Sequence, residues 1–173
     1  MQQFDNRLKR LAHTVDLAQL RIETDKILWQ PEHDRYKDQL SLQTNGQADW
    51  DSSTGSRPDD NESQWDKLHP DLIGTWWEDF FKSLPFKVYR SRLMTMHPRT
   101  CYSIHTDSTP RLHIAIVTHP QARFIFTSPS VFQHIPSDGH IWWVDTTKEH
   151  SAMNGSLKGR VHLVCCLDNT DPN

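Results

Sequence analysis

Two histidines and one aspartate in the second half of the chain have the residue types of a metal site. The candidate ligands are His105, Asp107 and His150. Two imidazoles and one carboxylate on three faces of a metal leave the three opposite positions open, which suits an Fe(II) ion that must bind a co-substrate and O2. Arg160 lies ten residues beyond the second histidine and would add a fixed cation. These four residues therefore indicate a non-haem iron centre.

The local sequence around the first two candidates favours an extended chain. Residues 100–104 have the pattern of a strand, and the Ser-Thr-Pro sequence at 108–110 is typical of a turn. In an extended segment, residues i and i+2 point to the same face, so His105 and Asp107 can reach one ion. A second His-x-Asp sequence, at residues 69–71, precedes apolar residues at helical spacing and indicates the start of a helix instead.

The region that contains the candidate ligands has the pattern of a β protein. Strand-like runs are separated by Pro, Gly, Ser and Asp turns, without an intervening helix. These runs are residues 86–96, 100–104, 112–118, 123–127, 131–136, 140–146 and 160–167. The arrangement favours an antiparallel sandwich or barrel.

The N-terminal half has a mixed pattern. Residues 1–20 are predicted to form an amphipathic helix packed on the back of a sheet, residues 39–43 a short strand, and residues 70–84 a second helix. The loop 44–64 is almost wholly polar, with Trp50 as its one large apolar residue. We expect this loop to be mobile or to act as a lid.

Length and composition indicate one domain. At 173 residues the chain can bury a sizeable core. Only 35% of the residues are hydrophobic, but 7 Trp, 7 Phe and 3 Tyr supply large apolar side chains. We expect a single domain over residues 1–173, with a helical and loop region at 1–85 and a β core at 86–167.

Charge and cysteine content limit the expected partners and compartment. The net charge is −3 and no run of Lys or Arg marks a phosphate-binding face, so no nucleic acid partner is expected. No apolar run of membrane-spanning length and no secretory signal is recognisable, so no membrane partner is expected. Three cysteines, two of them adjacent, give no disulfide framework, which favours the reducing cytoplasm.

Four short motifs occur in a fixed order between residues 86 and 167, around the candidate ligands. They are Arg111-Leu112-His113-Ile114, Trp143-Val144-Asp145-Thr146-Thr147, His150-Ser151-Ala152 and Arg160-Val161-His162-Leu163-Val164. Together they resemble the aspartyl/asparaginyl β-hydroxylase-like family. Residues 1–85 show no such resemblance, so we expect substrate choice to lie there and in the loops.

The resemblance implies a fold, an activity and a set of ligands. The fold is mainly β with flanking helices, a double-stranded β-helix of the jelly-roll, cupin-like kind. The activity uses Fe(II), 2-oxoglutarate and O2 to hydroxylate an amino acid, or an amino-acid residue in a peptide or protein, with release of succinate and CO2. By resemblance, His105, Asp107 and His150 match the metal ligands, and Arg160 matches the arginine that pairs with the distal carboxylate of 2-oxoglutarate.

Two further positions and two departures refine the resemblance. Arg111 and His113 match an Arg-x-His element near the carboxylate of the co-substrate or substrate. The best-known animal branch has Gly at the position of Asp107, so the chain resembles more closely the members with a complete triad, such as free-proline cis-hydroxylases. The hydroxyl group that some relatives direct to the 2-oxoglutarate carboxylate falls on Met94.

Two other classes of protein remain open on the sequence. A non-catalytic jelly-roll binding module, or a cupin-type hydrolase or isomerase with Zn²⁺ or Mn²⁺, could also hold a metal. Neither needs a buried cation at Arg160, whose guanidinium suits bidentate pairing with a carboxylate. Taken alone, His113 and His162 alternate with apolar residues and are more typical of sheet-face histidines than of ligands.

Overall fold

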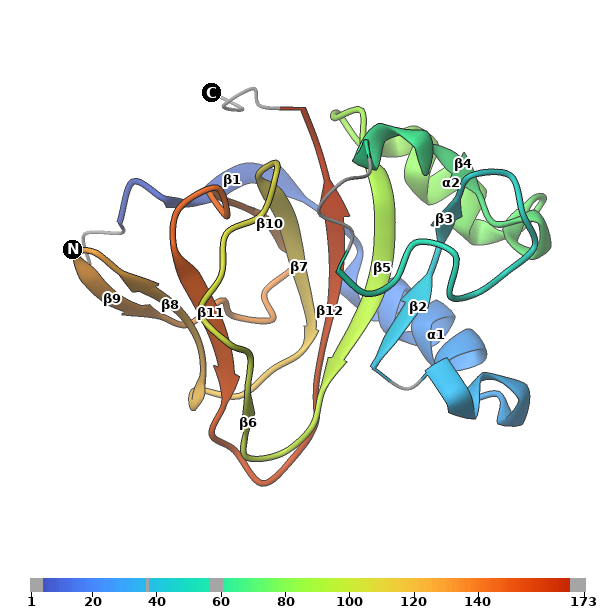
Figure 1. Ribbon diagram of the computed structural model, residues 1–173. Helices are drawn as coiled ribbons and strands as arrows, with labels where there is room; N and C mark the ends of the chain where they lie inside the picture. The colour runs from blue at the N-terminus through green and yellow to red at the C-terminus, as the bar shows by residue number, and fades with distance from the viewer. Residues whose placement is uncertain (1–4, 37, 57–60, 169–173) are drawn as a thin grey trace.

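Two antiparallel β-sheets face each other and form the body of the protein (Figure 1). This computed structural model describes residues 5–36, 38–56 and 61–168. The larger sheet has the strand order β1 (Leu8–Thr14), β10 (His140–Val144), β7 (Arg111–Val117), β12 (Arg160–Cys166), β5 (Tyr89–Met96) and β2 (Gln39–Ser41). The smaller sheet has the order β6 (Thr100–Cys101), β11 (His150–Asn154), β8 (Ala122–Thr127) and β9 (Ser130–Gln133). The predicted mainly β jelly roll is confirmed.

Two helices lie on the side of the larger sheet that faces away from the smaller one (Figure 1). They are α1 (Leu17–Leu28) and α2 (Trp76–Ser83). Shorter elements join them to the sheet: the 3-10 turns η1 (Pro31–Tyr36), η2 (Glu62–Gln64) and η3 (Pro70–Leu72), and the paired strands β3 (Gln43–Thr44) and β4 (Lys67–Leu68). Of the helices that the structure describes, none is long and apolar enough to cross a membrane.

Strand β12 shows how the larger sheet separates its two faces. All seven of its side chains are buried. Val161, Leu163 and Cys165 belong to the hydrophobic cluster that the sheet shares with α1 and α2. Arg160 and Val164 instead line a cavity between the two sheets. Successive side chains of a strand point to opposite faces, so one strand supplies both an apolar support and a polar cavity wall.

The apolar cluster under the helices is the main stabilising core. Trp77 of α2 and Leu20 of α1 are almost fully buried against Leu93 and Leu163 of the sheet. Full burial of such a side chain contributes roughly 1.5–3 kcal/mol relative to exposure. The helices therefore fix the positions of β5 and β12 from outside, and leave the inner face free to carry polar groups.

The prediction of a helix over residues 1–20 is wrong. Residues Leu8–Thr14 form β1, which pairs with β10 at the edge of the larger sheet. A helix begins only at Leu17, where the side chain of Asp16 accepts a hydrogen bond from the Gln19 backbone amide at 3.0 Å. The apolar spacing of this segment is compatible with both structures, and pairing with a strand far along the chain decides between them.

The predicted helix at residues 70–84 is also shorter than expected. Gly74 adopts a φ of 75°, which interrupts the chain between η3 and α2. The Thr75 hydroxyl then caps α2 by accepting a hydrogen bond from the Trp77 amide. A glycine with positive φ followed by a hydroxyl residue is a typical helix boundary, and it overrides the apolar spacing on either side.

The polar loop 44–64 is anchored at several points; residues 57–60 lie outside the described residues. The ring of Trp50 stacks on the ring of His69, with centroids 3.7 Å apart. Ser53 is fully buried, and its hydroxyl bonds to the hydroxyl of Ser41 in β2 at 2.8 Å. These contacts hold Trp50 and Ser53 against the rest of the protein, and the expectation that the loop is mobile or acts as a lid stays a prediction.

Strand β1 provides a stability test of this architecture. Replacing Leu8, which is fully buried between the sheets, with Ala should lower the free energy of unfolding by about 2–5 kcal/mol. The matched control is Ala12→Ser in the same strand, which changes an exposed side chain and should have little effect. Urea denaturation measures both variants. Equal stability of Leu8→Ala and wild type would contradict the placement of β1 in the core.

Candidate metal centre and ligand cavity

Two distant segments are held together at the candidate metal centre by a backbone bridge. The His105 amide donates to the His150 carbonyl at 3.0 Å, and the His150 amide donates back to the His105 carbonyl at 2.9 Å. This antiparallel exchange fixes the two Cα atoms side by side. The imidazole rings consequently lie close, with centroids 4.4 Å apart.

Both histidines direct the same nitrogen toward the centre. Nδ1 of His105 donates to the Ser103 carbonyl at 2.7 Å, and Nδ1 of His150 donates to the Lys148 carbonyl at 2.8 Å. Because a carbonyl only accepts, each ring carries its proton on Nδ1 and keeps the Nε2 lone pair for a metal. Phe124 stacks on the His150 ring at 5.1 Å and holds its plane.

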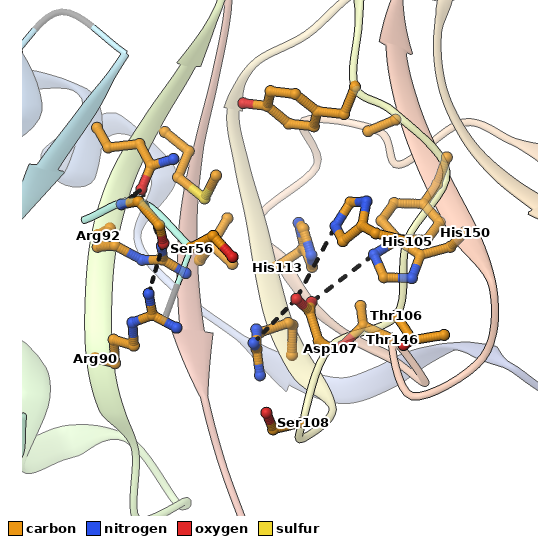
Figure 2. Close-up of a pocket in the computed structure, with 18 of the residues that line it drawn as sticks. Ser56, Arg90, Arg92, His105, Thr106, Asp107, Ser108, His113, Thr146 and His150 are labelled. Atoms are coloured by element: carbon orange, nitrogen blue, oxygen red, sulfur yellow. Dashed lines mark hydrogen bonds and ion pairs between the residues drawn. The ribbon is translucent and has the colours of Figure 1, made fainter. Parts of the chain in front are cut away.

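Asp107 completes the group from the same short segment as His105. Its amide donates to the Thr146 carbonyl at 2.8 Å, which fixes the backbone beside the end of β10. The carboxylate oxygens lie 4.0 Å from His105 Nε2 and 3.8 Å from His150 Nε2. One ligand atom from each residue lies within 4.8 Å of the others, and Figure 2 shows the three side chains turned toward one another.

The donor set fits a divalent transition metal. Burial lowers the pKa of His150, so its ring is neutral near pH 7, as a metal ligand must be. Exposure increases across the group, from 4% for the His150 side chain to 25% for Asp107 and 41% for His105. Two nitrogens and a carboxylate on one side leave the opposite side open to ligands, the arrangement that suits non-haem Fe(II).

A cavity of about 670 Å³ lies next to these residues, between the two sheets. That volume falls within the range of small-molecule sites, about 300–1,000 Å³. Figure 2 shows the candidate ligands on one wall and Arg90 and Arg92 of β5 on the opposite wall. Arg160 also lines the cavity, so the structure brings the predicted cation and the predicted metal ligands to one space.

Two of the cavity arginines have no acidic partner in the part of the chain that the structure describes. The side chains of Arg92 and Arg160 are buried, and neither forms an ion pair with any residue that the structure describes. Arg92 donates to the Gln39 side chain at 2.9 Å, and the Nε atoms of both arginines have no hydrogen-bond partner among the described residues. Burial lowers both pKa values to about 10, so both groups remain charged at pH 7. A buried, unpaired cation is costly, and an anionic ligand would offset that cost.

Arg111, a predicted ligand-binding residue, is instead engaged with protein atoms. Its Nη1 and Nη2 atoms bond to the two carboxylate oxygens of Glu62 at 3.0 and 2.8 Å. Nη1 also donates to the carbonyl and hydroxyl of Thr109, each at 2.6 Å. Nη2 lies 3.3 Å from an oxygen of Asp107. The structure thus places Arg111 beside a candidate metal ligand, with its two terminal nitrogens occupied.

His113, the second residue of the predicted Arg-x-His element, forms a buried pair with His162. Their Nδ1 atoms are 3.4 Å apart, and both side chains are buried. Burial, reinforced by the nearby charge of Arg160, holds the pKa of both rings well below the usual range. His113 lines the cavity, whereas His162 is a neutral histidine of the sheet interior.

Three residues of the cavity wall were missed by the sequence interpretation. Arg92 follows Arg90 at i+2 in β5, and two arginines on one face of a strand are a pattern that could have marked a polar inner face. Gln39, which orients Arg92, lies in a strand that the sequence predicted, but no function was assigned to its side chain. Glu62 lies in a polar loop rich in acidic residues, and nothing in its local sequence distinguishes it.

A jelly roll with two histidines, a carboxylate and buried arginines around one cavity has the architecture of the non-haem iron oxygenases. The family model described as aspartyl/asparaginyl β-hydroxylase matches residues 15–170. The chain therefore belongs to the aspartyl/asparaginyl β-hydroxylase family and is an oxygenase of the hydroxylase type. The match extends well upstream of residue 86, so the N-terminal region is part of the family pattern. Among curated proteins, none matches the chain.

Two solved structures share the fold. One is an oxidoreductase of the 2OG-Fe(II) oxygenase family from Burkholderia pseudomallei, at 14% identity and a TM-score of 0.54, covering 95% of this chain and 85% of that one. The other is the non-haem monooxygenase ThoJ in a nickel complex, at 12% identity and a TM-score of 0.51, covering 92% of this chain and 72% of that one. At these identities the similarity establishes a common fold.

The His113–His162 pair predicts a specific pH dependence of stability. Both rings are neutral in the folded protein but gain a proton in the unfolded chain below a pH of about 6.5. The free energy of unfolding should therefore fall as the pH falls from about 6.5, by up to about 1.4 kcal/mol per pH unit for each ring. His162→Leu should reduce this slope by roughly one ring's contribution. Urea denaturation of the metal-free protein between pH 7 and 5 measures it, and an unchanged slope would mean that His162 is charged when folded.

Proposed function

We propose that the protein is an Fe(II)- and 2-oxoglutarate-dependent dioxygenase. It hydroxylates an amino acid, or an amino-acid residue in a peptide or protein, and releases succinate and CO2. His105, Asp107 and His150 bind Fe(II), and Arg160 pairs with the distal carboxylate of 2-oxoglutarate. The family membership of the chain and the shape of the donor set support this assignment.

The observation that carries the proposal is the buried, unpaired guanidinium of Arg160. It is 4% exposed, lines the same cavity as the three metal ligands, and has no described carboxylate partner. A dicarboxylate that bound metal at one end would bring a second negative group into this cavity. The planar guanidinium could pair with that group through two parallel hydrogen bonds.

The protein's own contribution is positioning, charge and exclusion of water. Iron bound at this site would supply the oxidation by O2 that accompanies conversion of 2-oxoglutarate to succinate and CO2. His105 and His150 keep Nε2 unprotonated through their Nδ1 hydrogen bonds. Phe124 and Ala152 form an apolar wall beside His150, which limits water around the reacting groups.

Arg92 extends the proposal to the substrate. It is the other cavity cation without a described acidic partner, and it lies across the cavity from the metal ligands (Figure 2). We infer that Arg92 binds the carboxylate of the substrate, while Gln39 holds its guanidinium in place. A free amino acid, or a peptide residue that carries an accessible carboxylate, satisfies this requirement.

The alternative classes account less well for the cavity. A cupin-type hydrolase or isomerase, or a binding module without catalysis, could use the metal ligands, but gives no reason for the unpaired Arg160.

The compartment proposed from the cysteines is a reducing one, the cytoplasm. The structure records Cys101, Cys165 and Cys166 as free thiols.

Arg160→Gln and His150→Ala should have separable effects. Loss of Arg160 removes a charge-assisted bidentate pair, at a cost on the order of 2–5 kcal/mol of 2-oxoglutarate affinity, while Fe(II) binding persists. Raising 2-oxoglutarate should then recover part of the activity. His150→Ala removes one of three ligands, so it should weaken Fe(II) binding and abolish turnover at any 2-oxoglutarate concentration.

Anaerobic Fe(II) titration and succinate formation against 2-oxoglutarate concentration distinguish these outcomes. The amino-acid, peptide and protein substrates are supplied as a panel, because the substrate class is part of the proposal. If Arg160→Gln left the 2-oxoglutarate requirement unchanged, Arg160 would not bind 2-oxoglutarate. The proposal would then lose the residue that distinguishes the oxygenase from other metal-binding jelly rolls.

Arg92→Gln should give the complementary result. The KM for a carboxylate substrate should rise about tenfold or more, because one charge-assisted pair is lost, while the 2-oxoglutarate requirement stays near that of wild type. Arg160→Gln is the matched comparison. It should raise the 2-oxoglutarate requirement and leave the KM for the substrate near that of wild type. If Arg92→Gln raised the 2-oxoglutarate requirement instead, Arg92 would belong to the co-substrate site.

A further inference from the structure

One carboxylate outside the metal group holds two of the four cavity arginines. Glu62 lies in η2, and its side chain is 3% exposed. Oε1 accepts hydrogen bonds from Arg90 Nη1 and from Arg111 Nη2, and Oε2 accepts from Arg111 Nη1 and from the Thr109 hydroxyl at 2.7 Å. Burial alone would raise the pKa of Glu62, but Arg111, Thr109 and Arg90 together hold the pKa below its usual value.

Arg111 therefore lies between two carboxylates, with unequal contacts. Its bonds to Glu62 are bidentate, at 2.8 and 3.0 Å. Its contact with Asp107 is a single one at 3.3 Å, longer than the roughly 2.7–2.9 Å of a strong charge-assisted bond. The guanidinium is thus held by Glu62, and the Asp107 carboxylate retains the lone pairs that a metal would use.

We propose that Glu62 is a positioning residue that sets the metal affinity of the centre by keeping Arg111 away from Asp107. Without the charge of Glu62, the nearest recorded carboxylate for the buried guanidinium is Asp107. Because a buried cation without a counter-ion is costly, Arg111 would then pair tightly with Asp107 and compete with the metal for it. The inference rests on the proposed role of Asp107 as a metal ligand.

The same carboxylate also ties the polar loop to the sheet. Arg90, the second partner of Glu62, donates to the carbonyls of Ser53 and Gly55 at 3.0 and 2.7 Å. Arg90 adopts a φ of 50°, a conformation that non-glycine residues rarely use, so its surroundings determine this geometry. Loss of Glu62 should therefore loosen the loop as well, and the experiment has to separate this effect from metal affinity.

The test is a Co(II) titration, followed by its visible absorption, of wild type, Glu62→Gln, Arg111→Gln and the double variant. Glu62→Gln should weaken Co(II) binding about tenfold or more, the scale of one charge-assisted hydrogen bond. The double variant should regain affinity to within about threefold of Arg111→Gln, because the competing cation is gone. Arg111→Gln alone should not weaken binding.

Two further variants control for charge and folding. Glu149→Gln removes a carboxylate next to His150 that bonds only to Thr127 among the recorded contacts, and should change Co(II) affinity less than about twofold. Glu62→Asp keeps the charge but shortens the reach to the arginines, and should give an intermediate affinity. It replaces Glu62→Gln if near-ultraviolet circular dichroism shows that the latter is unfolded.

The outcomes distinguish this inference from the proposed function. If Glu62→Gln binds Co(II) as wild type does, or if the double variant is no better than Glu62→Gln, Glu62 is only a structural anchor of the loop and the inference fails. Tighter 2-oxoglutarate binding in Glu62→Gln would mean that Glu62 masks a ligand site on Arg111, which also overturns it. Failure of wild type to bind Co(II), or normal binding by His150→Ala, would instead reject the metal centre itself.

Discussion

The burial of positive charge on the inner face of the larger sheet is the constraint on which the rest of the site depends. Four arginines there are each at most 5% exposed: Arg90, Arg92, Arg111 and Arg160. A buried charge is tolerated only with a counter-charge or good hydrogen bonds. Glu62 provides this for two of them, and the other two, Arg92 and Arg160, are the ones that we propose to bind ligands. Under the proposed function, the arginines paired with Glu62 support the cavity wall, and the two without a described acidic partner form the binding site.

The register of the sheet separates the two unpaired cations. Arg160 pairs across the strands with Met96, and Arg92 pairs with Val164, so the two arginines stand four residues apart along the same ladder. Four residues of strand correspond to about 13 Å at roughly 3.3 Å per residue. Under the proposed function, the co-substrate and the substrate are therefore each held through a carboxylate by a different arginine. The apolar outer face, packed under α1 and α2, keeps this register fixed.

The sequence pattern correctly predicted those parts of the structure that depend on interactions between residues close together in the chain. The strand signals between 86 and 167 and the i, i+2 spacing of His105 and Asp107 come from neighbouring residues. The structure has a strand in each predicted run, although β6 covers only Thr100–Cys101 of the run 100–104, and it brings His105 and Asp107 together. Contacts between distant residues determined the rest. β1 is a strand because β10 offers it a free edge, and β11 is extended because β8 pairs with it, although its sequence His-Ser-Ala-Met-Asn has little strand preference. Which arginine is paired depends on Glu62, whose position no local pattern marks.

The N-terminal region contributes more to the site than its weak motifs suggest. Gln39 orients Arg92, and Glu62 holds Arg90 and Arg111, so three of the four buried arginines take partners from residues before 86. Among the residues that the structure describes, Arg160 has no hydrogen-bond or ion-pair partner from that region, and the groups that interact with its charge, Tyr102, His113 and His162, belong to the β core. The proposed co-substrate end is thus built by the jelly roll alone, whereas the proposed substrate end depends on the N-terminal region. Changes before residue 86 can therefore alter the choice of substrate while the 2-oxoglutarate end keeps its geometry.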